Sequence, residues 1–523
     1  MSEMNETPSH DTRGVSAPEV PRARTQPAQR YIALFATTLV LLFLLLSNQW
    51  VILPALPNWY DQQRFLALFV LATGLILYGC VMPCRPPFWL MGLIATAIAL
   101  AALSPWPGWV LAESAVFFGM GATASWIKTA CRSASASFHP NITISLLVIL
   151  ATAICLQPLM QILLMLTSVD DEFRTASLFI GFSNHRFFSQ AESILIPLMV
   201  LPAMTLSLNA RIQSLGNVIA VLLWMMAFAA GTRAFYVAMV LGALFALLYC
   251  GRSGRQWVQW QAKFAMLGGV CYTVAFMVIP YLLDIRIRTD NDRLANLESA
   301  FDSSGRLAMW RSAWTLIIEH PWTGIGPMHF ATLATHQGGS PGFAAHPHNA
   351  LIQILVEWGL PFGLLVLGGL SVAFWRLRRV SIAAASNTPK PALAGVMLIS
   401  WTIAFIYSLL DGSLVTPYTQ VLLAVFFGWS WSLLSETHQT ALNIQAPWFD
   451  TMTTTIAKIS CMIAGAFLIW LAVSPYNILL PHAENYAIEY PRQGFWPRFW
   501  SQGLINLPDD PRYKNPLFNR MNQ

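Results

Sequence analysis

The chain has 523 residues, of which 56% are hydrophobic and 10% charged, and its formal net charge is +6. A soluble domain carries roughly 25% charged residues, so this composition excludes an ordinary soluble protein and indicates an integral membrane protein. The basic residues are scattered over short segments between apolar runs, so we expect no nucleic-acid partner.

Residues 1–30 are polar and rich in Pro, Ser, Thr and Glu, and we expect a disordered cytoplasmic segment there. Apolar runs of spanning length then recur, and they predict an all-α, polytopic membrane bundle of about 12–13 transmembrane helices. The candidate spans are 31–54, 65–82, 88–106, 108–127, 142–166, 191–209, 215–231, 235–250, 264–283, 349–375, 391–410, 418–435 and 457–478.

The spans divide the chain into N-terminal transmembrane helices (31–283), a long loop (284–348), C-terminal transmembrane helices (349–478) and a short tail (479–523). Short cytoplasmic loops carry an excess of Lys and Arg. With the N-terminus inside, the inner segments hold most of the basic residues, and the short outer loops hold only Arg64, Arg174, Arg186 and Arg233. The bias therefore predicts that the long loop and the tail lie on the extracytoplasmic side.

Ionisable side chains near the outer ends of spans are functional candidates, because charge is costly in a bilayer. Glu113, Glu192, Arg233 and Asp411 have such positions. Hydrogen bonding between helices is an equally good explanation for each of the three carboxylates.

Within the long loop, Asp302 is a helix N-cap signal, and Leu307, Trp310, Trp314 and Ile317 follow at helical spacing. This pattern predicts an amphipathic helix lying on the outer leaflet. Arg306 falls in its first turn, one turn from Trp310, on which it could stack.

Arginine can present paired donors to phosphate oxygens. Arg306 and Arg311 in the loop helix, Arg233 in Gly231-Thr232-Arg233 and Arg186 after Asn184-His185 are the outer cations that could meet a diphosphate. The sequence does not show whether they converge, and an ordinary surface charge is the alternative for each.

The loop ends in His346-Pro347-His348-Asn349. Asn349, Gln353 and Glu357 then recur every fourth residue on an otherwise apolar helix, so they share a face that we expect to point into the bundle. His346 and His348 could be metal ligands, but no acidic cluster accompanies them in the sequence, so we predict no metal and no cofactor.

These residues together resemble the O-antigen ligase and polymerase superfamily of bacterial membrane glycosyltransferases, which includes protein-O-oligosaccharyltransferases. The matching pieces are Gly231 to Arg233, Ser304-Gly305-Arg306 with Trp310, His320-Pro321, Gly324-Ile325-Gly326, and His348-Asn349 followed by Gly359. The resemblance covers about residues 180–430. One departure is Gly359-Leu360-Pro361-Phe362-Gly363, one residue longer than the commoner glycine spacing.

The resemblance implies a GT-C-like fold and an inverting, metal-independent transfer of a glycan from undecaprenyl diphosphate to an acceptor hydroxyl at the periplasmic face of the bacterial inner membrane. It implies His348 as the catalytic base, and Arg233 and Arg306, with Arg186 and Arg311, as binders of the donor diphosphate. Asn349, Gln353, Glu357 and His346 would support the site.

The short tail favours a lipid A core acceptor, as in an O-antigen ligase, over a growing polysaccharide or a protein. A polymerase and a protein-O-oligosaccharyltransferase remain the alternatives. A flippase or transporter for lipid-linked sugars is the alternative of another class, but the repeated halves typical of transporters are missing from the sequence.

Overall fold

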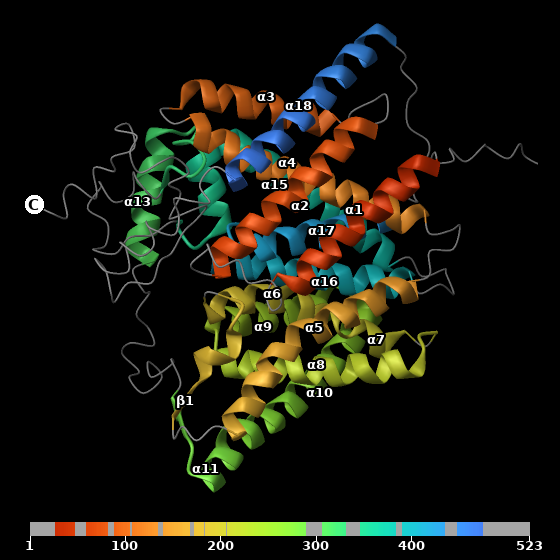
Figure 1. The fold of residues 1–523 in the computed structure, drawn as a ribbon, viewed down its shortest axis with the longest axis vertical. Helices are drawn as coiled ribbons and strands as arrows, with labels where there is room; N and C mark the ends of the chain where they lie inside the picture. The colour runs from red at the N-terminus through yellow and green to blue at the C-terminus, as the bar shows by residue number, and fades with distance from the viewer. Residues whose placement is uncertain are drawn as a thin grey trace, which may run out of the picture.

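The described part of the protein is a bundle of long helices with one short pair of strands (Figure 1). This computed structural model describes residues 27–47, 59–81, 88–104, 107–133, 140–167, 172–182, 184–205, 207–288, 306–330, 346–382, 390–434 and 447–473. Residues 1–26 of the expected N-terminal segment and the whole tail 479–523 lie outside these ranges. The expected disorder was wrong for residues 27–30, which form the first turn of a helix.

In chain order the elements are α1 (Pro27–Leu46), α2 (Trp59–Val81), α3 (Phe88–Leu103), α4 (Pro107–Ser133), α5 (Pro140–Thr167), β1 (Glu172–Arg174), the 3₁₀ helix η1 (Thr175–Phe179), α6 (His185–Leu198), α7 (Leu201–Met204), α8 (Ala210–Ala230), α9 (Arg233–Tyr249), α10 (Gly251–Thr273), the π-helix η2 (Val274–Val278), α11 (Ile279–Leu283), β2 (Arg286–Arg288), α13 (Arg306–Glu319), α15 (Ala350–Ile382), α16 (Lys390–Ser408), α17 (Pro417–Leu434) and α18 (Pro447–Val473).

The helices have the length and composition of membrane spans. Among the described residues nine helical stretches are long and apolar enough to cross a membrane, and three shorter apolar helices, α1, α3 and α9, accompany them. Helices are expected because a bilayer offers no water to hydrogen-bond an open backbone. Each span predicted from the sequence overlaps a helix of the structure, α17 for the span 418–435 and one of these twelve helices for every other span, which confirms an all-α, polytopic membrane protein.

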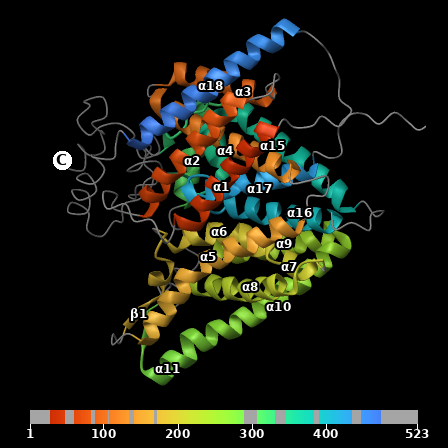
Figure 2. The same ribbon diagram turned by 45° about the vertical axis from the view of Figure 1, so that its right-hand side comes forward.

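Burial separates central from peripheral helices. The span of α6 and α7 is 89% buried in the bundle and that of α16 is 72% buried, against 17% for α10 with α11. Figures 1 and 2 agree, since α6 and α16 lie mid-bundle while α10 and α11 run along its lower edge. The α6–α7 and α16 spans, together with that of α4 at 78%, are therefore the described spans most covered by the rest of the bundle.

Glycines allow several helix pairs to approach closely, as is common in membranes. A Cβ on Gly428 of α17 would lie 2.5 Å from the backbone oxygen of Ala124 in α4, and one on Gly268 of α10 would lie 2.5 Å from Trp224 Cβ in α8. A larger residue at either position would force these helices apart.

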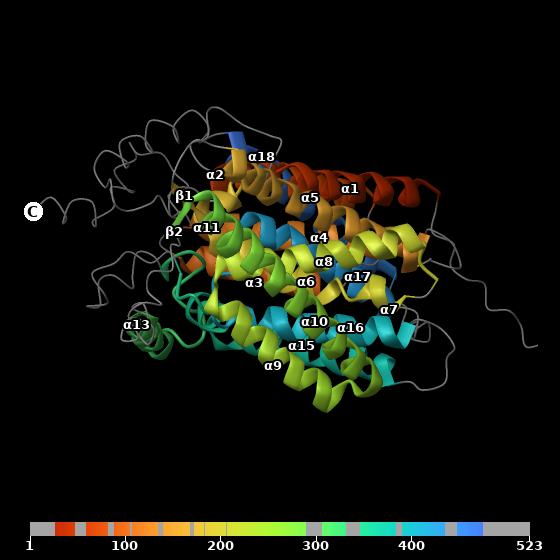
Figure 3. The same ribbon diagram turned by 90° about the horizontal axis from the view of Figure 1, so that it is seen from below.

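One end of the bundle carries the non-spanning elements. β1 pairs in parallel with β2, Glu172 opposite Arg286 and Arg174 opposite Arg288. α13 lies across the same end, at the left in Figures 1 and 3. Trp310 of α13 donates a hydrogen bond to Pro347 O, so the start of α15 also lies at this end.

The buried face of α13 differs from the predicted one. Ala313, Leu316 and Ile317 are buried and pack with Ile325 and Val356, whereas Leu307 is 54% and Trp314 62% exposed. Packing against α15 therefore uses a face of α13 that includes Ile317 but not Leu307 or Trp314, and the position of the helix on the outer leaflet stays a prediction. The N-cap signal at Asp302 lies outside the described residues.

Candidate functional site

A kink in α15 supports the end of the helix that carries the candidate base. Gly359 has φ 80° and ψ 168°, so the helix is interrupted there. The freed carbonyls are used: Ile325 N–H donates to Val356 O at 2.8 Å and Gly326 N–H to Glu357 O at 3.0 Å. The longer glycine spacing therefore leaves the kink at Gly359, and the Gly324–Gly326 turn is bonded to it.

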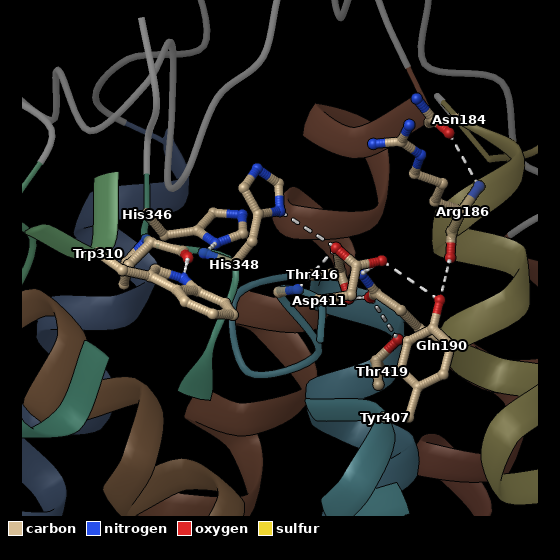
Figure 4. Close-up of polar contacts among 12 residues, drawn as sticks. Asn184, Arg186, Gln190, Trp310, His346, His348, Tyr407, Asp411, Thr416 and Thr419 are labelled. Carbon is tan, nitrogen blue, oxygen red and sulfur yellow. Dashed lines mark hydrogen bonds and ion pairs between the residues drawn. The ribbon is translucent and has the colours of Figure 1, made fainter. Parts of the chain in front are cut away.

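His348 is placed by the first turn of α15 and by α13. Asn349 caps the helix, its Oδ1 accepting from Ile352 N–H at 3.0 Å. The indole N–H of Trp310 donates to Pro347 O at 2.8 Å, as Figure 4 shows. This bond ties α13 to the histidine segment, and the stacking of Arg306 on Trp310 stays a prediction. His348 itself has φ 52°, a left-handed conformation uncommon outside glycine.

His348 is paired with an acidic residue of the α16–α17 turn. Its Nδ1 lies 3.2 Å from Asp411 Oδ1, and its side chain is 29% exposed while that of Asp411 is 4% exposed. With Nδ1–H donating to the carboxylate, Nε2 of the neutral ring is left as a proton acceptor. Asp411 thus fixes both the orientation and the tautomer of His348.

His346 has a different environment. It is buried, its Nδ1 accepts from His348 N–H at 3.1 Å, and its ring packs on Gly412, where any Cβ would collide with it. The two imidazole centres are 4.2 Å apart. The structure therefore places His346 beneath His348, with contacts that shape the turn.

Asp411 is held by several donors at once. Gly412 N–H donates to Oδ1 at 2.8 Å, and Tyr407 O–H and Gln190 Nε2 reach Oδ2 at 3.2 Å and 3.5 Å. Burial alone raises the pKa of Asp411, but the hydrogen bond and charge of His348, the Gly412 N–H and the charge of His346 lower it by more. The pKa therefore lies well below its ordinary value, and Asp411 stays a carboxylate.

Three of the four predicted arginines come together near this carboxylate. Burial lowers the pKa of Arg306, the charge of Asp411 raises it, and the like charges of Arg186 and Arg233 lower it further. Arg306 and Arg186 are half-buried and Arg233 is exposed at the start of α9. Three cations close enough to influence one another form a region suited to a multiply charged anion.

The remaining predicted residues are Arg311, which is exposed, and Gln353 and Glu357, which are buried. Arg311 is exposed, and at five residues from Arg306 it points about 140° away around α13, so its place lends no support to a diphosphate role. Gln353 and Glu357 are buried as expected, and Glu357 Oε1 accepts from Phe330 N–H at 3.4 Å. Glu357 thus ties the loop to α15.

The sequence predicts no metal site at His346 and His348, because no cluster of acidic residues accompanies them in the chain. In the structure the acidic residue Asp411 lies beside both histidines. Even so, the described ranges contain no group of three or more His, Cys, Asp or Glu side chains arranged to hold a metal ion.

Sequence reasoning did not pair Asp411 with His348. The available signal was an acidic residue at the outer end of a span, and Glu113 and Glu192 gave the same signal. All three carboxylates are buried in the structure. The choice between them depends on a contact across 63 residues, which no local pattern encodes.

The fold and these side chains define a multi-pass membrane protein with a polar site at one end of its bundle. The family model described as O-antigen ligase matches residues 218–367, which include Arg233, Arg306 and His348. This match confirms the resemblance to the O-antigen ligase and polymerase superfamily and supports a glycosyltransferase-like enzyme acting on a lipid-linked glycan and an acceptor. No curated protein matches this sequence.

Proposed function

We propose that the chain is an O-antigen ligase-like glycosyltransferase of GT-C-like fold. It moves a glycan from undecaprenyl diphosphate to a hydroxyl of a lipid A core acceptor at the periplasmic face of the inner membrane. The observation that carries this proposal is the position of the His348–Asp411 pair beside the Arg186, Arg233 and Arg306 charges.

In the proposed reaction, His348 Nε2 takes the proton of the acceptor hydroxyl as its oxygen attacks the anomeric carbon. The bond from that carbon to the diphosphate oxygen breaks in the same displacement, so the anomeric configuration inverts. Asp411 stabilises the imidazolium that forms, as a carboxylate does when bonded to the distal ring nitrogen.

Arg186, Arg233 and Arg306 are proposed to bind the leaving diphosphate. A diphosphate is a weak base, so its departure needs charge stabilisation more than a proton donor. Fixed guanidinium groups supply that charge without a metal, and each can bind two oxygens. We assign Asn349, Gln353, Glu357 and His346 to support of the catalytic histidine and its loop.

Purified protein in detergent tests the proposal directly. Given a glycan on undecaprenyl diphosphate and a lipid A core acceptor, the wild type should join the two, and His348→Ala should not. Extension of the glycan on its lipid carrier would indicate a polymerase, and modification of a protein substrate a protein-O-oligosaccharyltransferase. Flipping in vesicles without transfer in detergent would replace the enzyme with a transporter.

Sidedness is tested by labelling single cysteines in cells. Thr315 in α13 and Arg255 in α10 are both exposed and should fall on opposite sides. A membrane-impermeant reagent should reach Thr315→Cys from the periplasm and Arg255→Cys only after the membrane is opened. The reverse pattern would contradict a periplasmic site.

A further inference from the structure

Arg64 stands out because the sequence places it in a short outer loop, whereas the structure buries it. It lies in the second turn of α2, and its residue exposure is 1%. An arginine inside a membrane bundle is costly and calls for a specific role. Topology alone does not explain a guanidinium shielded this completely.

The Arg64 guanidinium holds the far end of the turn that carries Asp411. Nη1 donates to Gln420 Oε1 at 2.6 Å, and Nη2 donates to Val415 O at 2.6 Å and to Tyr60 Oη at 3.2 Å. Gln420 in turn donates to Leu414 O at 2.6 Å, and Tyr60 O–H to Val415 O at 2.9 Å. Two successive carbonyls of the turn are thus fixed from α2 and α17.

The same turn is short and internally bonded, so a shift at one end moves the other. Val415 N–H donates to Gly412 O at 3.1 Å, next to Asp411. Thr416 O–H donates to Gln190 Oε1, and Gln190 Nε2 reaches Asp411. Arg64 is therefore connected to the Asp411 carboxylate through backbone and through Gln190.

We propose that Arg64 is a positioning residue of the site: by clamping Leu414, Val415 and Gln420 it sets where Asp411 meets His348. The catalytic part of this inference rests on the proposed function. The clamp needs two donors in a fixed plane, which a guanidinium has and an ammonium lacks. Lysine at position 64 keeps the charge, but all its donors leave one nitrogen atom, so it cannot reproduce the bonds that Nη1 and Nη2 make to Gln420 and Val415.

The test compares Arg64→Lys with Gln261→Met in the full-length protein. Gln261 is a matched control, because it is also buried and bridges helices, accepting from Trp224 Nε1 at 2.8 Å and donating to Ile196 O at 2.7 Å. Since a displacement near 1 Å can lower a rate by up to about 10²-fold, Arg64→Lys should lower kcat between about 10- and 100-fold and leave the donor KM unchanged. Gln261→Met should leave kcat near wild type.

A double-mutant cycle separates positioning from general damage. In an Asp411→Asn background, adding Arg64→Lys should lower kcat further by less than about twofold, because the effect of Arg64 passes through Asp411. Gln420→Asn, which shortens the second part of the clamp, should behave in the same way. Wild-type kcat in Arg64→Lys, or an undiminished loss in the Asp411→Asn background, would overturn the proposal.

A readout without transfer keeps this inference distinct from the proposed reaction. In histidine-labelled protein at fixed pH, the ring ¹⁵N shifts of His348, assigned by their loss in His348→Ala, report its bond to Asp411. Arg64→Lys should move them toward the Asp411→Asn values, and Gln261→Met should not. Unchanged ¹⁵N shifts in Arg64→Lys would overturn the positioning role of Arg64. Changed shifts, together with normal transfer by His348→Ala, would leave the positioning role standing and contradict His348 as the base.

Discussion

The two halves of the candidate site are built differently. On the base side, Asp411 is buried and bonded to His348, Gly412, Tyr407 and Gln190. On the cation side, the like charges of Arg186 and Arg233 act on Arg306, and among the described residues neither Arg186 nor Arg306 forms an ion pair. The first half is preorganised by the protein itself, while the second is suited to an anion that the substrate would bring.

The largest effect is expected where the base side loses its reacting group. His348→Ala should lower the rate of glycan transfer by about 10²–10⁴-fold, the usual contribution of a general base. His346→Ala is the matched control and should lose much less, because the His346 ring packs on Gly412 and shapes the turn. Equal losses in the two variants, measured at equal protein level, would remove the distinction between the histidines.

Asp411→Asn should come next. The amide keeps the size of the carboxylate but lacks its charge, so His348 is less well held and its imidazolium less stabilised. We expect a loss of about 10²-fold in kcat, comparable to that of a misplaced catalytic group. Kinetics with saturating donor check this, and a variant with normal kcat would show that the 3.2 Å contact has no part in catalysis.

Changes on the cation side should act on the donor. A hydrogen bond to a charged group is worth about 1.5–3 kcal/mol, so Arg306→Ala should lower kcat/KM for the donor by about 10–100-fold. Arg306→Lys should retain part of it, since charge remains but paired donation is lost. Arg311→Ala serves as the control in α13. If it proved as harmful as Arg306→Ala, proximity to Asp411 would not be what selects the functional arginine.

The smallest effect concerns stability in acid. The folded-state pKa of Asp411 lies below its unfolded value of about 3.9, so this carboxylate stabilises the fold above that value and loses the contribution as pH falls toward the folded pKa. Thermal unfolding in detergent should show wild type losing more stability than Asp411→Asn between about pH 5 and about pH 3. Parallel losses would contradict the lowered pKa.

Much of this structure was open to prediction from sequence. The spans follow from apolar length, and His348, Arg233 and Arg306 follow from motif pieces on one side of the membrane. Gln353 and Glu357 were placed on an inward face by their spacing, and both are buried. These features are local, so a short window of sequence contains them.

The remaining features depend on how distant helices meet. The bond from Arg64 to Val415 joins residues 351 positions apart, and the contact between α13 and α15 decides which face of α13 is buried. Hydrophobic spacing predicted that α13 is amphipathic but not how far it is turned. From sequence, Arg64 is one basic residue in a short loop between spans and is used only to judge which side of the membrane the loop faces. Its role in the site can be inferred only from its partners in the structure.

Donor binding and transfer, measured side by side in His348→Ala and Arg306→Ala, test the central claim most directly. The account predicts opposite patterns: His348→Ala binds an undecaprenyl diphosphate-linked glycan with near wild-type Kd but does not transfer it, whereas Arg306→Ala binds it weakly and regains part of its transfer rate as donor concentration rises. Loss of donor binding in His348→Ala together with normal donor binding in Arg306→Ala would contradict the division of the site into a base side and a diphosphate side.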